Sequence, residues 1–82
     1  MLDLDMTKTD FLHHFTGCFH QTPPDAIQWN TRFRELEEWG SMLALIVLSM
    51  LDAEYNCLLS PETFRKAHTV EDLYLVVKEQ QS

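Results

Sequence analysis

The chain has 82 residues, of which 45% are hydrophobic and 23% are charged. This length allows one domain (residues 1–82, with a core of about 7–78) and excludes a large enzyme fold with its own substrate cleft. Thirteen acidic residues against six basic ones give a net charge of −7. We therefore expect no nucleic acid partner, because phosphate binding needs a basic surface.

We expect no signal peptide in this sequence. The N-terminal stretch MLDLDMTK is acidic and lacks the apolar run of a signal peptide. The longest apolar run, residues 42–51, is ten residues long, whereas a membrane span needs about 20. Two cysteines are too few for a disulfide framework. We expect a cytoplasmic monomer without a membrane span.

The first predicted element is a helix over residues 7–19. Thr7 or Thr9 is suited to cap its start, and Asp10 suits its first turn. Apolar side chains recur there at the helical period and predict one buried face. They are Phe11, Leu12, Phe15, Cys18 and Phe19.

Residues 21–40 are predicted to form a long connection without strands. The QTPP sequence near its start cannot continue a helix. Phe33, Leu36 and Trp39 then recur every third residue, which predicts a turn or short helix pinned to the core.

The second predicted helix, residues 42–55, is apolar on nearly every side. We assign its core stripe to Ala44, Val47, Leu48, Leu51 and Tyr55. Met42, Leu43, Leu45, Ile46 and Met50 are expected to lie outside that stripe. Either aromatic residues of the long connection cover them, or they form an exposed surface for a partner.

Two further helices complete the predicted fold. Ser60 and Pro61 begin a short helix over residues 61–66. Thr69 and Asp72 are spaced as a capping box at the start of a last helix, whose end after Val77 is expected to fray. The predicted fold is a small all-α bundle of three longer helices and a short third one.

Ser41 has two interpretations. The simpler one is an N-cap, because serine accepts a hydrogen bond from an amide of the first helical turn. The other is a modification site, because the free amides and the dipole of a helix N-terminus favour a phosphate or phosphodiester.

The residues around Ser41 carry a family resemblance. The sequence Trp-Gly-Ser-Met (residues 39–42) precedes an apolar helix that ends in Asp-Ala-Glu-Tyr, and Thr-Val-Glu-Asp-Leu-Tyr follows at residues 69–74. Over about residues 33–77 the chain resembles the acyl carrier protein family, stand-alone bacterial type. The resemblance implies that Ser41 bears a 4′-phosphopantetheine arm, whose thiol holds acyl groups as thioesters. The chain would then be a carrier in a specialised lipid, polyketide or peptide pathway, and not an enzyme.

The resemblance also implies partners. They are a phosphopantetheinyl transferase and acyl-loading and acyl-processing enzymes with basic docking surfaces. Residues 35–64 contain six acidic residues and no lysine or arginine, which suits such docking. The implied partner surface consists of Glu37, Glu38, Met42, Leu45, Ile46, Met50 and Glu54.

Gly40 departs from the family pattern, in which an aspartate that assists the transferase precedes the serine. The alternative function is therefore a carrier-like helical interaction protein that is not phosphopantetheinylated. We expect no metal site, because His13 and His14 are adjacent and cannot share a helix face. Cys57, in a predicted loop, is expected to be exposed.

Overall fold

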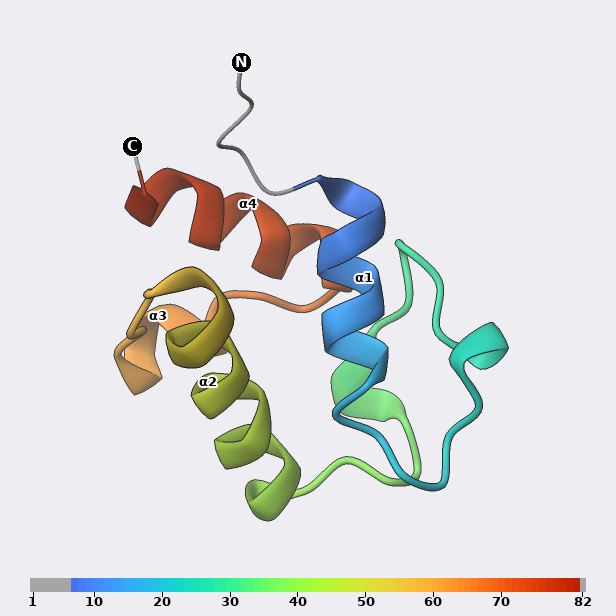
Figure 1. Cartoon of the computed structure of the whole chain (residues 1–82). Helices are drawn as coiled ribbons and strands as arrows, with labels where there is room; N and C mark the ends of the chain where they lie inside the picture. Colours follow the sequence, from blue (N-terminus) through green and yellow to red (C-terminus); the bar gives the residue numbers. More distant parts are fainter. Residues whose placement is uncertain (1–6, 82) are drawn as a thin grey trace.

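The computed structural model describes residues 7–81, which fold into four α-helices and two short 3-10 helices (Figure 1). In Figure 1 the connection between the first two α-helices loops out to the right and returns to the lower end of the second one. The prediction of a small all-α bundle with one short helix is confirmed. The elements are α1 (Lys8–Thr16), η1 (Pro24–Ala26), η2 (Phe33–Glu35), α2 (Ser41–Tyr55), α3 (Pro61–Arg65) and α4 (Val70–Gln81).

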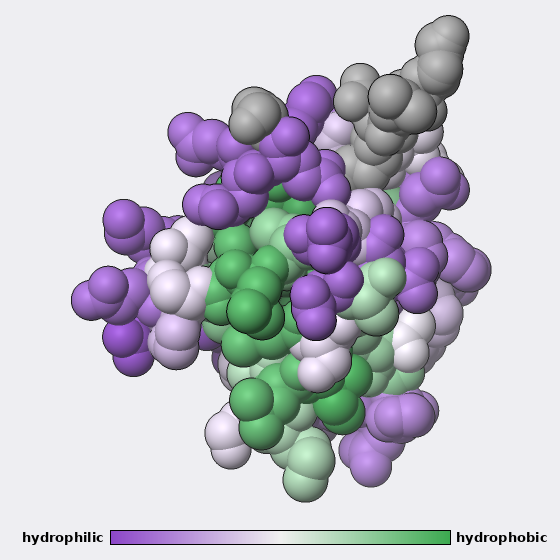
Figure 2. Space-filling view, turned by 60° about the vertical axis from the view of Figure 1, so that its left-hand side comes forward, coloured by the Kyte–Doolittle hydropathy of each residue, from purple (hydrophilic) through white to green (hydrophobic). Residues whose placement is uncertain are grey.

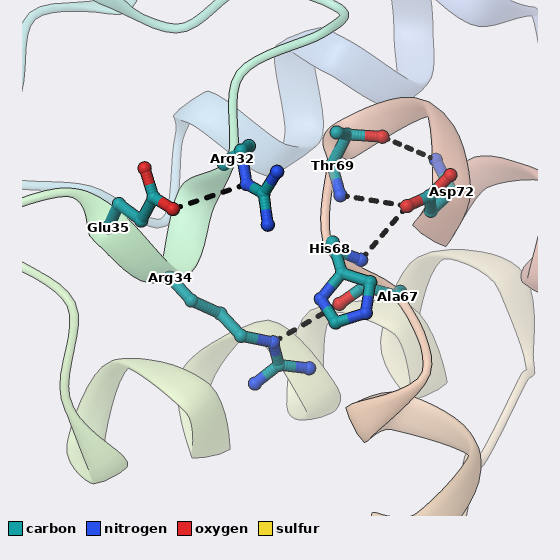
Figure 3. Close-up of polar contacts among 7 residues, drawn as sticks. All are labelled: Arg32, Arg34, Glu35, Ala67, His68, Thr69 and Asp72. Carbon is teal, nitrogen blue, oxygen red and sulfur yellow. Dashed lines mark hydrogen bonds and ion pairs between the residues drawn. The ribbon is translucent and has the colours of Figure 1, made fainter.

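The helix starts follow the capping signals of the sequence. The side chains of Thr7 and Ser60 cap α1 and α3 as predicted. The capping box of α4 is also confirmed: Thr69 Oγ1 accepts the Asp72 N–H at 3.1 Å, and the Asp72 carboxylate accepts the Thr69 N–H at 3.1 Å (Figure 3). The carboxylate accepts the His68 N–H as well, and these bonds, that from His68 foremost, lower the pKa of Asp72.

One hydrophobic core joins the helices and the long connection. The Phe11 ring of α1 lies 5.5 Å from the Tyr74 ring of α4 and 5.6 Å from the Tyr55 ring of α2, measured between ring centroids. Phe33 of η2 lies 5.3 Å from Phe15 of α1. The largest fully buried side chains are Phe11, Phe15, Ile27, Phe33, Val47, Leu51, Val70, Leu73 and Val77.

Two helix ends differ from the prediction. α1 ends earlier because Gly17 takes the C-cap position, and Cys18 and Phe19 follow it outside the helix but remain buried. α4 continues to Gln81, so the predicted fraying is wrong for the described part of this end. The Gln81 side-chain amide donates to the Tyr55 carbonyl at 2.7 Å and thereby holds the end of α4 against the end of α2.

The buried face of α2 shares Val47 and Leu51 with the predicted stripe but extends from them toward Leu43. Leu43, Val47 and Leu51 are buried, spaced four apart, whereas Ala44 is only partly buried. The expectation that Leu43 faces outward is wrong. Because α2 is apolar on nearly all sides, its sequence did not distinguish these two neighbouring faces.

The irregular segments also contribute to the core. Ile27 is 2% exposed and Cys57 is 5% exposed, so the expected exposure of Cys57 is wrong. Burial raises the pKa of the Cys57 thiol and raises that of Cys18 to about 11. Both side chains therefore act as small hydrophobic residues of the core.

Candidate functional site

Ser41 is the first residue of α2 and is exposed. The N-cap position belongs to Gly40, whose backbone is extended (φ −173°, ψ −179°) and whose carbonyl accepts the Ala44 N–H at 2.9 Å. The interpretation of Ser41 as the N-cap is therefore wrong. Its hydroxyl makes no hydrogen bond with any other residue that the structure describes, and it remains available to solvent.

The start of α2 is open around this hydroxyl. The first N–H groups of any helix have no acceptor within the helix. Gly40 provides no side-chain cap for those of α2. A Cβ atom added at Gly40 would meet nothing within 4 Å. Free amides at the positive end of a fifteen-residue helix favour a phosphate group bonded to the Ser41 oxygen.

Trp39 fixes the chain two residues before Ser41. Its ring centroid lies 4.9 Å from that of Phe33, 6.2 Å from that of Phe64 and 6.3 Å from that of Phe19. Aromatic pairs at these separations are favourable beyond their buried area. The site thus begins on a rigid aromatic cluster, and only Gly40 separates this cluster from the serine.

Glu38 holds the start of the long connection, just after α1, against the segment that leads to Ser41. Its carboxylate accepts the backbone N–H groups of His20 (2.8 Å), Gln21 (3.0 Å) and Thr22 (2.8 Å) and the Thr22 hydroxyl (2.8 Å). These bonds, that from the His20 backbone foremost, lower the pKa of Glu38 to about 2. Both carboxylate oxygens of this expected partner residue are thus engaged within the chain.

We expect Glu38→Gln to remove an acid-dependent part of the stability. Because folding lowers the Glu38 pKa, the ionised carboxylate stabilises the fold fully above its ordinary pKa of 4.5, and this stabilisation is lost as the pH falls toward about 2. The melting temperature of the parent should therefore approach that of the variant between these pH values. Circular dichroism melts measure this. Glu37→Gln is the matched control, and an identical pH profile for both variants would contradict the assignment.

An apolar strip, formed by Met42, Leu45 and Ile46, lies exposed on the first two turns of α2. These side chains are 73%, 64% and 36% exposed. Figure 2 shows hydrophobic surface over the side of the molecule formed by α2 and the segments after it, reaching the lower end of α2. The interpretation that aromatic residues of the connection cover this strip is wrong for these positions: Trp29, for example, packs on Tyr74 of α4.

The other expected partner residues differ in their surroundings. Met50 is partly buried against the core, and Glu37 is exposed. The Glu54 carboxylate lies 3.4 Å from His14 Nε2, and the Tyr55 hydroxyl lies 2.9 Å from Nδ1 of the same ring. Burial foremost raises the pKa of Tyr55 to about 12. The side chain of Glu54 is half-exposed and contacts α1 through His14.

Arg34 holds the long connection against the end of α3, a contact that the sequence does not predict. Its Nε donates to the Ala67 carbonyl at 3.1 Å (Figure 3) and its Nη2 to the Phe64 carbonyl at 2.6 Å. Both acceptors lie at least 30 residues away along the chain, so no local pattern could reveal them.

Within residues 7–81, no three histidine, cysteine, aspartate or glutamate side chains are placed to bind a metal ion together. In the same part of the chain, no helix combines the length and apolar character needed to cross a membrane. Comparison with protein-family models, with curated proteins and with solved structures finds no match to this chain. Any functional conclusion therefore depends on the residues and geometry around Ser41.

Proposed function

We propose that this chain is an acyl carrier protein that bears a 4′-phosphopantetheine arm on Ser41 and is not itself an enzyme. The observation that carries the proposal is the exposed Ser41 hydroxyl at the start of α2, next to unpaired helical amides. Such an arm would let acyl intermediates travel as thioesters between the active sites of partner enzymes. Tethering raises the local concentration of the acyl group at each active site.

The surroundings of Ser41 fit the attached group. The Ser41 oxygen would form a phosphodiester bond, and the first-turn amides of α2 would face the charged phosphate. Exposed acidic side chains before and after the uncharged part of α2, among them Glu37, Asp52 and Glu54, would attract basic side chains of partner enzymes. The aromatic cluster around Trp39 would keep the attachment point still while the arm moves.

The test is modification in vitro. The purified chain is incubated with a broad-specificity phosphopantetheinyl transferase, coenzyme A and Mg²⁺, and its intact mass is measured. We expect the mass increase of one phosphopantetheine group, and we expect complete loss of this increase in Ser41→Ala. A parent protein that stays unmodified with several transferases, while a known carrier in the same assay is modified, would overturn the proposal.

Gly40→Asp should accelerate this modification. The backbone at Gly40 is extended, and a new Cβ meets nothing within 4 Å, so the side chain fits without rearrangement. Aspartate would restore the carboxylate that, by the resemblance, assists the transferase directly beside the reacting serine, an effect separate from docking on α2, and we expect a rate increase of roughly tenfold. As an N-cap it should also raise the free energy of unfolding by a few tenths of a kcal/mol, about 0.3.

Gly40→Asn is the matched control, because asparagine caps a helix equally well but carries no charge. It should reproduce the gain in stability, measured by urea denaturation, without the gain in rate. Equal rates for the two variants would show that the cap and not the charge governs modification.

A helical interaction protein without a prosthetic group is the second candidate function. Gly40 in place of the family aspartate and the 73% exposure of Met42 favour it, because exposed apolar side chains of this kind mark protein contacts. Absence of any mass increase in the parent protein, together with correct folding, would support this candidate.

A further inference from the structure

The first three turns of α2 carry no charge. Residues 41–51 are eleven consecutive uncharged residues, about 16 Å of helix at 1.5 Å per residue. The large exposed hydrophobic side chains of this stretch are the strip of Met42, Leu45 and Ile46, whose spacing of three and four residues places them on one face. The surface next to Ser41 is therefore apolar and not acidic.

Acidic side chains lie at both ends of this uncharged stretch. Glu35 and Glu37 precede it and are exposed; Asp52 and Glu54 follow it and are exposed. A surface with an apolar centre and charged ends resembles the centre and rim of a protein interface. Its complement is an apolar depression with basic side chains at its two ends.

The position of Ser41 indicates which partner would cover this strip. An arm attached to Ser41 must enter the active site of any enzyme that acts on it. The rim of that active site must then contact the first turns of α2, where Met42 is 73% exposed and Leu45 is 64% exposed. This argument rests on the proposed function.

We infer that the enzymes acting at Ser41 dock on the strip of Met42, Leu45 and Ile46 mainly through apolar contact, with the flanking acids as secondary contacts at the rim. Burial of apolar surface is insensitive to moderate salt, whereas attraction between exposed charges is screened over about 8–10 Å. Apolar docking and charge-driven docking therefore predict opposite responses to salt and to added negative charge.

The test uses the phosphopantetheinyl transferase as the probe. The quantity measured is kcat/KM for transfer to Ser41 in the parent, in Leu45→Glu and in Ile46→Glu, at about 50 mM and 500 mM salt. Leu75→Glu is the matched control, because Leu75 is 53% exposed but lies on α4. Circular dichroism checks that the parent and the three variants are folded.

We expect kcat/KM to fall roughly tenfold in Leu45→Glu and in Ile46→Glu, and to stay within about twofold of the parent in Leu75→Glu. The parent value should fall less than about threefold between the two salt concentrations. Unchanged or faster transfer in the α2 variants, or a parent value that falls more than tenfold with salt, would overturn apolar docking while leaving Ser41 as the modified residue. No transfer to the parent would instead overturn the proposed function, and this inference with it.

Discussion

Phe33→Ala should lower the free energy of unfolding by about 3–5 kcal/mol, as expected for truncation of a fully buried phenylalanine. The Phe33 side chain is 0% exposed. Its ring lies 4.9 Å from Trp39, 5.3 Å from Phe15 and 6.2 Å from Phe64. Truncation removes contacts between η2 and α1, between η2 and α3, and between η2 and the residue that anchors the approach to Ser41.

Urea denaturation followed by circular dichroism and by tryptophan fluorescence measures this effect. Phe33→Leu keeps much of the volume and should cost about 1 kcal/mol. Because the total stability of a small domain is about 5–15 kcal/mol, Phe33→Ala is expected to leave a marginal fold. A cost below about 1 kcal/mol would contradict the placement of η2 in the core.

Signals that are local in sequence predicted most of the fold. The Ser60 cap and the Thr69–Asp72 capping box act over three residues, and the structure contains both. The recurrence of Phe33 and Trp39 in the connection also identified residues that pack against the core. The capping signals involve residues within one helical turn of each other, and tertiary contacts do not change the structure that these signals predict.

The features that the sequence did not reveal depend on distant contacts. Glu38 binds backbone groups 16 to 18 residues away, and an isolated glutamate gives no indication of that. Ile27 and Cys57 are buried in irregular segments, where no periodicity marks an inner face. The prediction that Leu43 faces outward is wrong because an apolar helix offers two adjacent faces of nearly equal hydrophobicity.

For the candidate site, too, local sequence predicted some features and distant contacts decided others. Ser41 was identified from its neighbours in sequence, and the structure places it exposed at the start of α2. The exposure of Met42 and Leu45 could not be decided beforehand, since it depends on where the aromatic residues of the connection pack. Trp39 packs on Phe33 and Phe64, so it fixes the chain before Ser41 and does not cover Met42 and Leu45.

Arg34→Met should cost roughly 2–3 kcal/mol of unfolding free energy. A hydrogen bond from a charged donor contributes about 1.5–3 kcal/mol, and the two bonds of Arg34 share one partly buried guanidinium, so their contributions do not simply add. The Arg34 guanidinium donates to the carbonyls of Phe64 and Ala67. It also lies 4.9 Å from the Phe64 ring and 5.2 Å from the Phe33 ring, where a cation is attracted to the aromatic face.

Two variants separate these contributions, again by urea denaturation. Arg34→Lys keeps the charge near the rings but lacks the planar fork that reaches two carbonyls, so about half of the loss is expected. Arg32→Met is the matched surface control: its ion pair with Glu35, at 3.2 Å, joins side chains that are 62% and 69% exposed (Figure 3), and such pairs contribute about 0.5 kcal/mol or less. Equal losses for Arg32→Met and Arg34→Met would contradict the assignment of Arg34 as the residue that fastens the long connection to α3. Because that connection carries Trp39, loss of the Arg34 hydrogen bonds should also loosen the packing of Trp39, which fixes the chain just before Ser41.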